Sequence, residues 1–135
     1  MSVGILLITH GALGSELLRI ASAIFGACPA RADALEVEND APCDPLLEDA
    51  ERRAAELDEG EGVLVLTDLF GSTPANLALA LAGRRDRIRV LAGVNLPMLV
   101  RALSYAALDL EQLADRAITG GRDGILACGA RPEEA

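Results

Sequence analysis

The chain has 135 residues, 51% of them hydrophobic, which is enough for one domain with a proper core and too many for a disordered tail. Its formal net charge of −9 and its 2% of aromatic residues argue against nucleic-acid binding, because phosphate backbones repel it and bases find little to stack on. No apolar stretch reaches the roughly 18 residues of a membrane span and no basic residue precedes the first one, so we expect a soluble, cytoplasmic domain.

The chain begins with a predicted strand and a predicted helix. Residues 3–8 form an apolar run without alternation, which predicts a strand buried on both faces of a parallel sheet. Apolar side chains then recur at helical spacing over residues 17–25. Ser15 is the candidate cap of this helix and Gly26 its candidate stop, because these residue types favour helix ends.

A second, weaker strand is predicted over residues 33–37. Asp44 and Pro45 follow it, and this pair is typical of a helix N-cap with proline at the first helical position. The helix that they predict has one apolar face, made by Leu46, Leu47, Ala50, Ala54 and Leu57.

The third strand repeats the pattern of the first. Residues 63–66 are a continuous run of Val and Leu, which predicts another strand buried on both faces. A loop over residues 69–73 leads to Pro74 and to a helix of small residues over 75–82, which Gly83 is expected to close.

The last part of the chain predicts a strand at Ile88–Ala92 and two helices, around residues 97–107 and 109–119. Gly120 and Gly121 are expected to end the second of these helices. The turn ahead of the strand is expected to be a solvated loop, and it carries Arg84, Arg85, Arg87 and Arg89.

Strands that alternate with helices predict an α/β fold, a three-layer sandwich with a mostly parallel sheet. We expect the strand order 2-1-3-4, in which the first and third strands are neighbours. Residues 1–120 then form the domain, and residues 121–135 are a C-terminal tail or edge strand. Within that tail, the apolar run of residues 125–128 is the candidate for an antiparallel edge strand.

Three features follow the ends of the predicted strands, where sheets of this kind bind their ligands. His10 follows the first strand and Asp68 the third, so in the expected order their side chains approach each other. A carboxylate that accepts a hydrogen bond from Nδ1 leaves Nε2 of the imidazole as a nucleophile. Gly71, Ser72 and Thr73 place two hydroxyls beside a helix N-terminus, a setting that suits phosphate. Each feature alone also fits a structural role, but their meeting at one edge favours a phosphate site.

Other kinds of site find little support in the sequence. The three cysteines show no Cys-x-x-Cys spacing and the chain has a single histidine, so no metal site is expected. Without any lysine the chain has no Walker-type sequence, and no cofactor is expected. The run Thr9-His10-Gly11 superficially resembles the motif of the phosphoglycerate mutase and acid phosphatase family, but the arginine and the second histidine of that motif are missing.

Three segments together resemble the mannose-family enzyme IIA domain of the bacterial sugar phosphotransferase system: residues 4–11 (GILLITHG), 62–76 (GVLVLTDLFGSTPAN) and 93–99 (GVNLPML). The resemblance implies a phosphotransferase with a phosphohistidine intermediate, in which His10 accepts a phosphoryl group on Nε2 from the phosphocarrier protein HPr and passes it to a IIB component. It implies that Asp68 holds the active histidine and that Thr73 is the hydroxyl residue near the phosphate. Ser72 stands where the family commonly has a second glycine.

The resemblance also implies a homodimer in which a C-terminal strand, here residues 125–128, is exchanged, and membrane contact only through partner subunits. Two other functions fit the sequence. In the first, phosphorylation of His10 regulates binding to a target without sugar transport. In the second, the chain is a flavodoxin-like module that binds a small ligand, although its few aromatic residues argue against flavin stacking.

Overall fold

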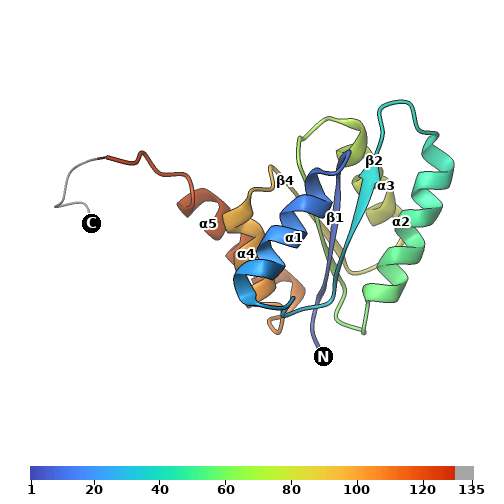
Figure 1. Cartoon of the computed structure of the whole chain (residues 1–135). Coiled ribbons are helices and arrows are strands. Elements are labelled where there is room, and N and C mark those ends of the chain that lie inside the picture. Colours follow the sequence, from blue (N-terminus) through green and yellow to red (C-terminus); the bar gives the residue numbers. More distant parts are fainter. Residues whose placement is uncertain (130–135) are drawn as a thin grey trace.

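The computed structural model describes residues 1–129, which alternate between strands and helices (Figure 1). The strands are β1 (Gly4–His10), β2 (Ala32–Val37), β3 (Val63–Thr67) and β4 (Ile88–Ala92). The helices are α1 (Leu13–Phe25), α2 (Cys43–Leu57), α3 (Thr73–Arg84), α4 (Leu96–Ser104) and α5 (Leu110–Asp123). None of the helices in this described part is both long and apolar enough to cross a bilayer.

The four strands form one parallel sheet in the order β2-β1-β3-β4, which confirms the predicted topology. Helices α1, α4 and α5 cover one face of the sheet, and α2 and α3 cover the other (Figure 1). The molecule is therefore the three-layer α/β sandwich that the sequence predicts, with one apolar core on each side of the sheet.

The two central strands, β1 and β3, are buried on both faces. Residues 5–8 of β1 and 63–66 of β3 have no exposed surface. Because successive side chains of a strand point to opposite faces, alternate members of each run pack into the two cores. The edge strand β4 carries the exposed Arg89 instead. The continuous apolar runs in the sequence thus mark the centre of the sheet.

Two helices begin before the residues that the sequence offers as caps. α1 begins at Leu13, so Ser15 lies inside its first turn, where its hydroxyl donates to Glu36 at 2.8 Å. Pro42 is the N-cap residue of α2, so Asp44 also lies in a first turn and not at the cap. Both predictions are wrong, since Ser15 lies three positions after the observed cap of α1 and Asp44 two positions after that of α2. An acidic side chain is also favourable within the first turn of a helix, and the Ser15 hydroxyl bonds to Glu36 instead of the helix backbone.

Of the glycines predicted to end helices, one does so and three lie inside a helix. α1 ends as predicted at Gly26, whose φ is 84°. α3 continues through Gly83, and α5 continues through Gly120 and Gly121, so these three are not stops. A Cβ atom on Gly120 would lie 2.6 Å from Cβ of Arg101 in α4, so the glycine permits close packing of the two helices. The predicted domain boundary at residue 120 falls inside α5.

The arginines at the turn ahead of β4 form ion pairs with acids of neighbouring segments. The pairs are Arg84 with Glu51, Arg85 with Asp58, Arg87 with Glu61, and Arg89 with Glu111. Most of these side chains are exposed, as the predicted solvated loop requires, and exposed pairs add little stability. They lie at the end of the sheet where β3 and β4 begin.

Residues 125–129 follow α5 without regular secondary structure. The candidate edge strand over residues 125–128 is therefore not paired with the sheet in this single chain, and β3 is the one strand beside β4 in the described part. Residues 130–135 of the predicted tail lie outside the described residues.

Candidate functional site

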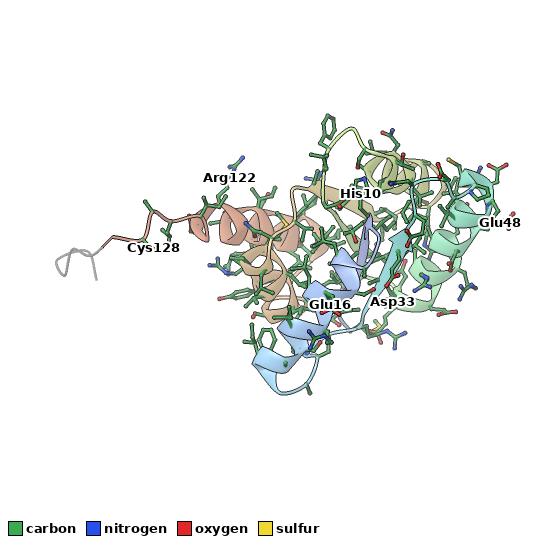
Figure 2. All side chains as sticks on the ribbon, turned by 45° about the horizontal axis from the view of Figure 1, so that its top comes forward. His10, Glu16, Asp33, Glu48, Arg122 and Cys128 are labelled. Carbon is green, nitrogen blue, oxygen red and sulfur yellow. The ribbon has the colours of Figure 1, made fainter. Side chains whose placement is uncertain are left out.

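The candidate site lies at the edge of the sheet where its strands end. His10 is the last residue of β1, and Figure 2 shows it at the tip of that strand. Asp68 directly follows β3, which pairs with β1. The parallel pairing brings the two residues together across 58 positions of sequence, as the expected strand order predicts.

His10 and Asp68 are joined by two hydrogen bonds. Nδ1 of His10 lies 2.7 Å from Oδ2 of Asp68, and the backbone N–H of His10 donates to the same oxygen at 3.1 Å. The other carboxylate oxygen accepts from the backbone N–H of Leu69 at 3.1 Å. The carboxylate is thus held by the backbone on two sides and in turn holds the imidazole ring.

The pKa of Asp68 lies below its usual value. Burial of the carboxyl acts to raise it, but the hydrogen bonds from the ring and the backbone of His10 lower it by more. An ionised carboxylate accepts hydrogen bonds and cannot donate them, so Nδ1 carries the proton in this contact, and the lone pair of the neutral imidazole is then on Nε2. The His10 side chain is 42% exposed and that of Asp68 is 11% exposed. The ring is therefore partly exposed, with a mostly buried anion behind it.

The loop after Asp68 is folded tightly against itself. Gly71 has a φ of 85°, which favours glycine. Both the hydroxyl and the backbone N–H of Ser72 donate to the carbonyl oxygen of Leu69, at 2.6 and 3.2 Å. Ser72 is also the N-cap residue of α3, and its Oγ accepts from the N–H of Ala75 at 3.5 Å. The cap is thus Ser72, whereas Thr73 is the exposed first residue of the helix.

The three predicted phosphate-binding residues thus lie at the same edge of the sheet as His10, because α3 follows β3 directly. The hydroxyl of Ser72 already donates within the loop, while Thr73 is exposed at the start of α3. Backbone N–H groups in the first turn of a helix point out of its N-terminal end and suit an anion. This arrangement is chemically suited to hold a phosphoryl group beside an imidazole.

The segments around the site carry negative charge and no arginine. They are residues 10–14, 37–45, 68–76 and 93–97, which we call the carboxyl edge. Their charged side chains are Glu38, Asp40, Asp44 and Asp68. Two apolar side chains of the same edge are well exposed, Leu69 at 63% and Phe70 at 78%. No group of three or more candidate metal ligands occurs within residues 1–129.

Two buried threonines beside the site have contacts that sequence reasoning missed. Thr9 precedes His10 and accepts a hydrogen bond from the backbone N–H of Gly14 at 2.7 Å. Thr67 precedes Asp68, and its buried hydroxyl has no partner among residues 1–129. A polar residue at the buried end of an otherwise apolar strand is the signal that points to both.

Comparison with known proteins places these observations in context. A family model named EIIA-man, described as the fructose IIA component of the phosphotransferase system (PTS), matches residues 4–118. The mannose-specific EIIAB component of Escherichia coli K12 is 33% identical over an alignment of 138 residues. That alignment covers 99% of this chain but only 42% of the relative, so the chain spans less than half of its length.

Solved structures show the same architecture. The EIIA component from Streptococcus agalactiae has a TM-score of 0.81 and 27% identity, and the match covers 94% of this chain and 97% of that one. The mannose/sorbose-specific IIA subunit from Enterococcus faecalis has a TM-score of 0.79 and 25% identity, with 97% and 98% covered.

Proposed function

This chain belongs to the EIIA-man family of PTS IIA components, and from that membership we propose that it carries a phosphoryl group between two proteins. HPr donates the phosphoryl group to His10, and a IIB component of a mannose-type system accepts it. The pairing of His10 with Asp68 at 2.7 Å is the observation that carries this proposal. The comparisons favour this role over the regulatory alternative, because the relatives described above are PTS components.

The geometry accounts for the chemistry. The lone pair of Nε2 attacks phosphorus in line with the bond to the donor, and the new P–N bond forms as that bond breaks. Nδ1 keeps its proton, and the Asp68 carboxylate stabilises the positive charge that the ring gains as Nε2 bonds to phosphorus. Transfer to the acceptor reverses these roles, so the enzyme is a phosphotransferase with a phosphohistidine intermediate.

The loop and the start of α3 support the phosphoryl oxygens in this proposal. Gly71 gives the loop its turn, Ser72 fixes the loop by its two bonds to Leu69, and Thr73 offers a hydroxyl at the surface. The positive end of the α3 dipole adds a fixed potential, although Pro74 has no N–H and those of Ala75 and Asn76 already donate to Ser72. The four segments of the carboxyl edge contain no arginine, and Arg122 of α5 lines the groove beside Gly93 and Asn95.

A protein partner fits this surface better than a small ligand does. The incoming phosphoryl group is anionic and the carboxyl edge carries only negative side chains, so the partner must present a basic surface. The exposed Leu69 and Phe70 beside the nucleophile offer apolar contact area of the kind that protein interfaces bury. HPr and IIB are the proposed partners on this ground and on the family membership.

A homodimer is part of the proposal. A groove of about 340 Å³ runs along the outer side of β4, lined among others by Val90, Ala92, Ile118 and Ile125. In the tail, Ile125 is 75% exposed and Leu126 is 74% exposed. Exchange of residues 125–128 between two copies would add an antiparallel strand to each β4 and bury these side chains.

We also place the reaction in the cytoplasm. Cys28, Cys43 and Cys128 are all free and exposed thiols. Exposed thiols persist in a reducing compartment and oxidise readily outside one.

The first experiment is intact-mass analysis after incubation with phosphoenolpyruvate, enzyme I and HPr. The wild-type chain should gain one acid-labile phosphoryl group, and His10→Ala should gain none while keeping its fold, because His10 lies at a strand end and is partly exposed. Circular dichroism of the variant is the control for folding. Phosphate retained on His10→Ala would refute the assignment of the residue, and no phosphate on the wild type would refute the carrier function.

A further inference from the structure

The residue before His10 caps the helix that follows it. An N-cap side chain usually accepts a hydrogen bond from the second or third N–H of its helix. The N-cap residue of α1 is Ala12, which has no polar side chain to do so. The N–H of Gly14, the second residue of α1, instead donates to Oγ1 of Thr9 at 2.7 Å. Thr9 is completely buried, so no water replaces this acceptor.

This hydrogen bond closes a loop of six residues, 9–14, with His10 inside it. The N–H of Gly11 donates to the carbonyl of Val37 at 3.0 Å, and the N–H of His10 donates to Asp68. The backbone on both sides of His10 is thus anchored to three different elements, which are α1, β2 and the end of β3. Figure 1 shows how directly α1 follows the tip of β1.

Gly14 is the residue that makes the contact short. A Cβ atom at this position would lie 2.9 Å from Oγ1 of Thr9 and 3.0 Å from Cβ of Leu7. The first turn of α1 therefore approaches the last residues of β1 more closely than a larger residue at position 14 would allow. Successive side chains of a strand point to opposite faces, so Thr9 lies on the α1 face of the sheet and His10 does not. Thr9 therefore acts on His10 through the backbone.

We propose that Thr9 is a positioning residue for phosphoryl transfer: its hydroxyl fixes the His10 backbone so that Nδ1 meets Asp68 and Nε2 faces the incoming phosphorus. The proposal rests on the proposed role of His10 as phosphoryl acceptor. A misplacement of the nucleophile by about 1 Å is enough to slow a transfer by one or two orders of magnitude.

The test compares three variants. Thr9→Val keeps the shape of the side chain and removes the acceptor, whereas Thr9→Ser keeps the hydroxyl. Asp109→Ala is the control for lost capping, because Asp109 accepts from the N–H of Gln112 at 2.8 Å at the start of α5. Asp109 lies beside Glu61 and Arg87, at the opposite end of the sheet from His10.

Two quantities are measured on each variant. The first is the rate of phosphoryl transfer from phosphorylated HPr. The second is the tautomer of the imidazole from its ¹⁵N chemical shifts, which are unambiguous because the chain has one histidine. The tautomer needs no partner protein, so it tests the positioning of His10 even if the wild type accepts no phosphate. Hydrogen exchange of the Gly14 amide in the wild type tests the bond itself, should Thr9→Val not fold.

We expect Thr9→Val to transfer about tenfold more slowly and to lose part of its Nδ1–H tautomer, while Thr9→Ser and Asp109→Ala stay close to the wild type. A Thr9→Val protein with the rate and the ring shifts of the wild type overturns the proposal. Equal losses in Thr9→Val and Thr9→Ser also overturn it, because the hydroxyl is then not responsible. An unprotected Gly14 amide in the wild type overturns it as well.

Discussion

At the scale of single residues, Asp68 links the two tasks of the site. One of its oxygens accepts from both the ring and the backbone of His10, and the other accepts from Leu69. The carboxylate therefore orients the imidazole and also ties the end of β1 to the loop after β3. A change of this residue should affect transfer and stability separately, and the two effects can be measured apart.

Asp68→Asn should slow phosphoryl transfer by at least tenfold and keep the fold. The amide has the same shape but no charge, and its NH₂ group donates where the carboxylate accepts, which favours the wrong ring tautomer. The measurement is the transfer rate from phosphorylated HPr. Asp40→Asn is the matched control, because it removes one charge from the same edge without touching His10, and it should transfer at nearly the wild-type rate. A wild-type rate in Asp68→Asn would make Asp68 a structural residue only.

The lowered pKa of Asp68 predicts how stability depends on pH. A carboxyl whose pKa is lower in the native state binds fewer protons there than in the unfolded state, so the free energy of unfolding rises with pH. The contribution is present above the unfolded pKa of about 3.9 and is lost as the pH falls through the lower native value. Urea unfolding of wild type and Asp68→Asn at several pH values should show a stability difference that is constant near neutrality and shrinks below about pH 4. A difference that persists unchanged in strong acid would contradict this.

At the scale of elements, the packing of α5 on α4 depends on three glycines. Cβ atoms at Gly120 and Gly121 would lie 2.6 and 3.1 Å from side-chain atoms of α4, and a Cβ atom at Gly124 would overlap with Pro97. Glycine lowers helix propensity, yet here it allows two helix backbones to approach. The start of α1 likewise depends on a neighbouring element, since Thr9 of β1 accepts the hydrogen bond that caps it.

The same substitution at two helical glycines should therefore have opposite effects. Gly120→Ala should lower the free energy of unfolding by about 1–3 kcal/mol, because its Cβ meets the side chain of Arg101. Gly83→Ala, in α3, should raise the free energy of unfolding by about 0.5–1 kcal/mol, because a Cβ there meets nothing within 4 Å. Chemical denaturation measures both. A gain in stability for Gly120→Ala would show that α4 and α5 are less tightly packed than in this structure.

At the scale of the whole molecule, the two ends of the sheet differ in charge. The ion-paired arginines ahead of β4 lie at the end where β3 and β4 begin, and the carboxyl edge has acids and no arginine. The acids of the carboxyl edge attract a positively charged partner to the edge that holds His10. The groove along β4 is also lined by Gly93 and Asn95, so it reaches the carboxyl edge, and a second copy of the chain bound there would lie next to the surface proposed for the phosphoryl partner.

The proposed exchange of tails makes a prediction about assembly. Replacing Ile125 and Leu126 together by aspartate should turn the proposed dimer into a monomer, because unpaired charges are costly to bury along β4. Leu79→Asp is the control, since Leu79 is 50% exposed on α3, on the other face of the sheet. Light scattering coupled to size exclusion measures the molar mass. A dimer that survives the double substitution would show that residues 125–128 do not hold it together.

Much of the fold and of the candidate site follows from local patterns. The apolar runs at residues 5–8 and 63–66 predict buried central strands, because only strands covered on both faces lack alternation. His10 and Asp68 could be predicted as neighbours because parallel strands end at one edge of the sheet. The helix starts near Ser15 and Asp44 were less predictable, because such side chains stabilise several positions around a helix N-terminus.

The sequence by itself thus determined the alternation of strands and helices and the central strands, because each depends on residues close together in the chain. The approach of His10 and Asp68, 58 positions apart, followed from the strand order that this alternation predicts. Only the tertiary structure decided that Thr9 caps α1, that Gly120 and Gly121 are packing residues, and which acids the arginines meet. Those contacts depend on how closely whole elements approach one another. A glycine or a threonine has the same local preferences whether a helix lies against it or not, so its role appears only when the neighbour is in place.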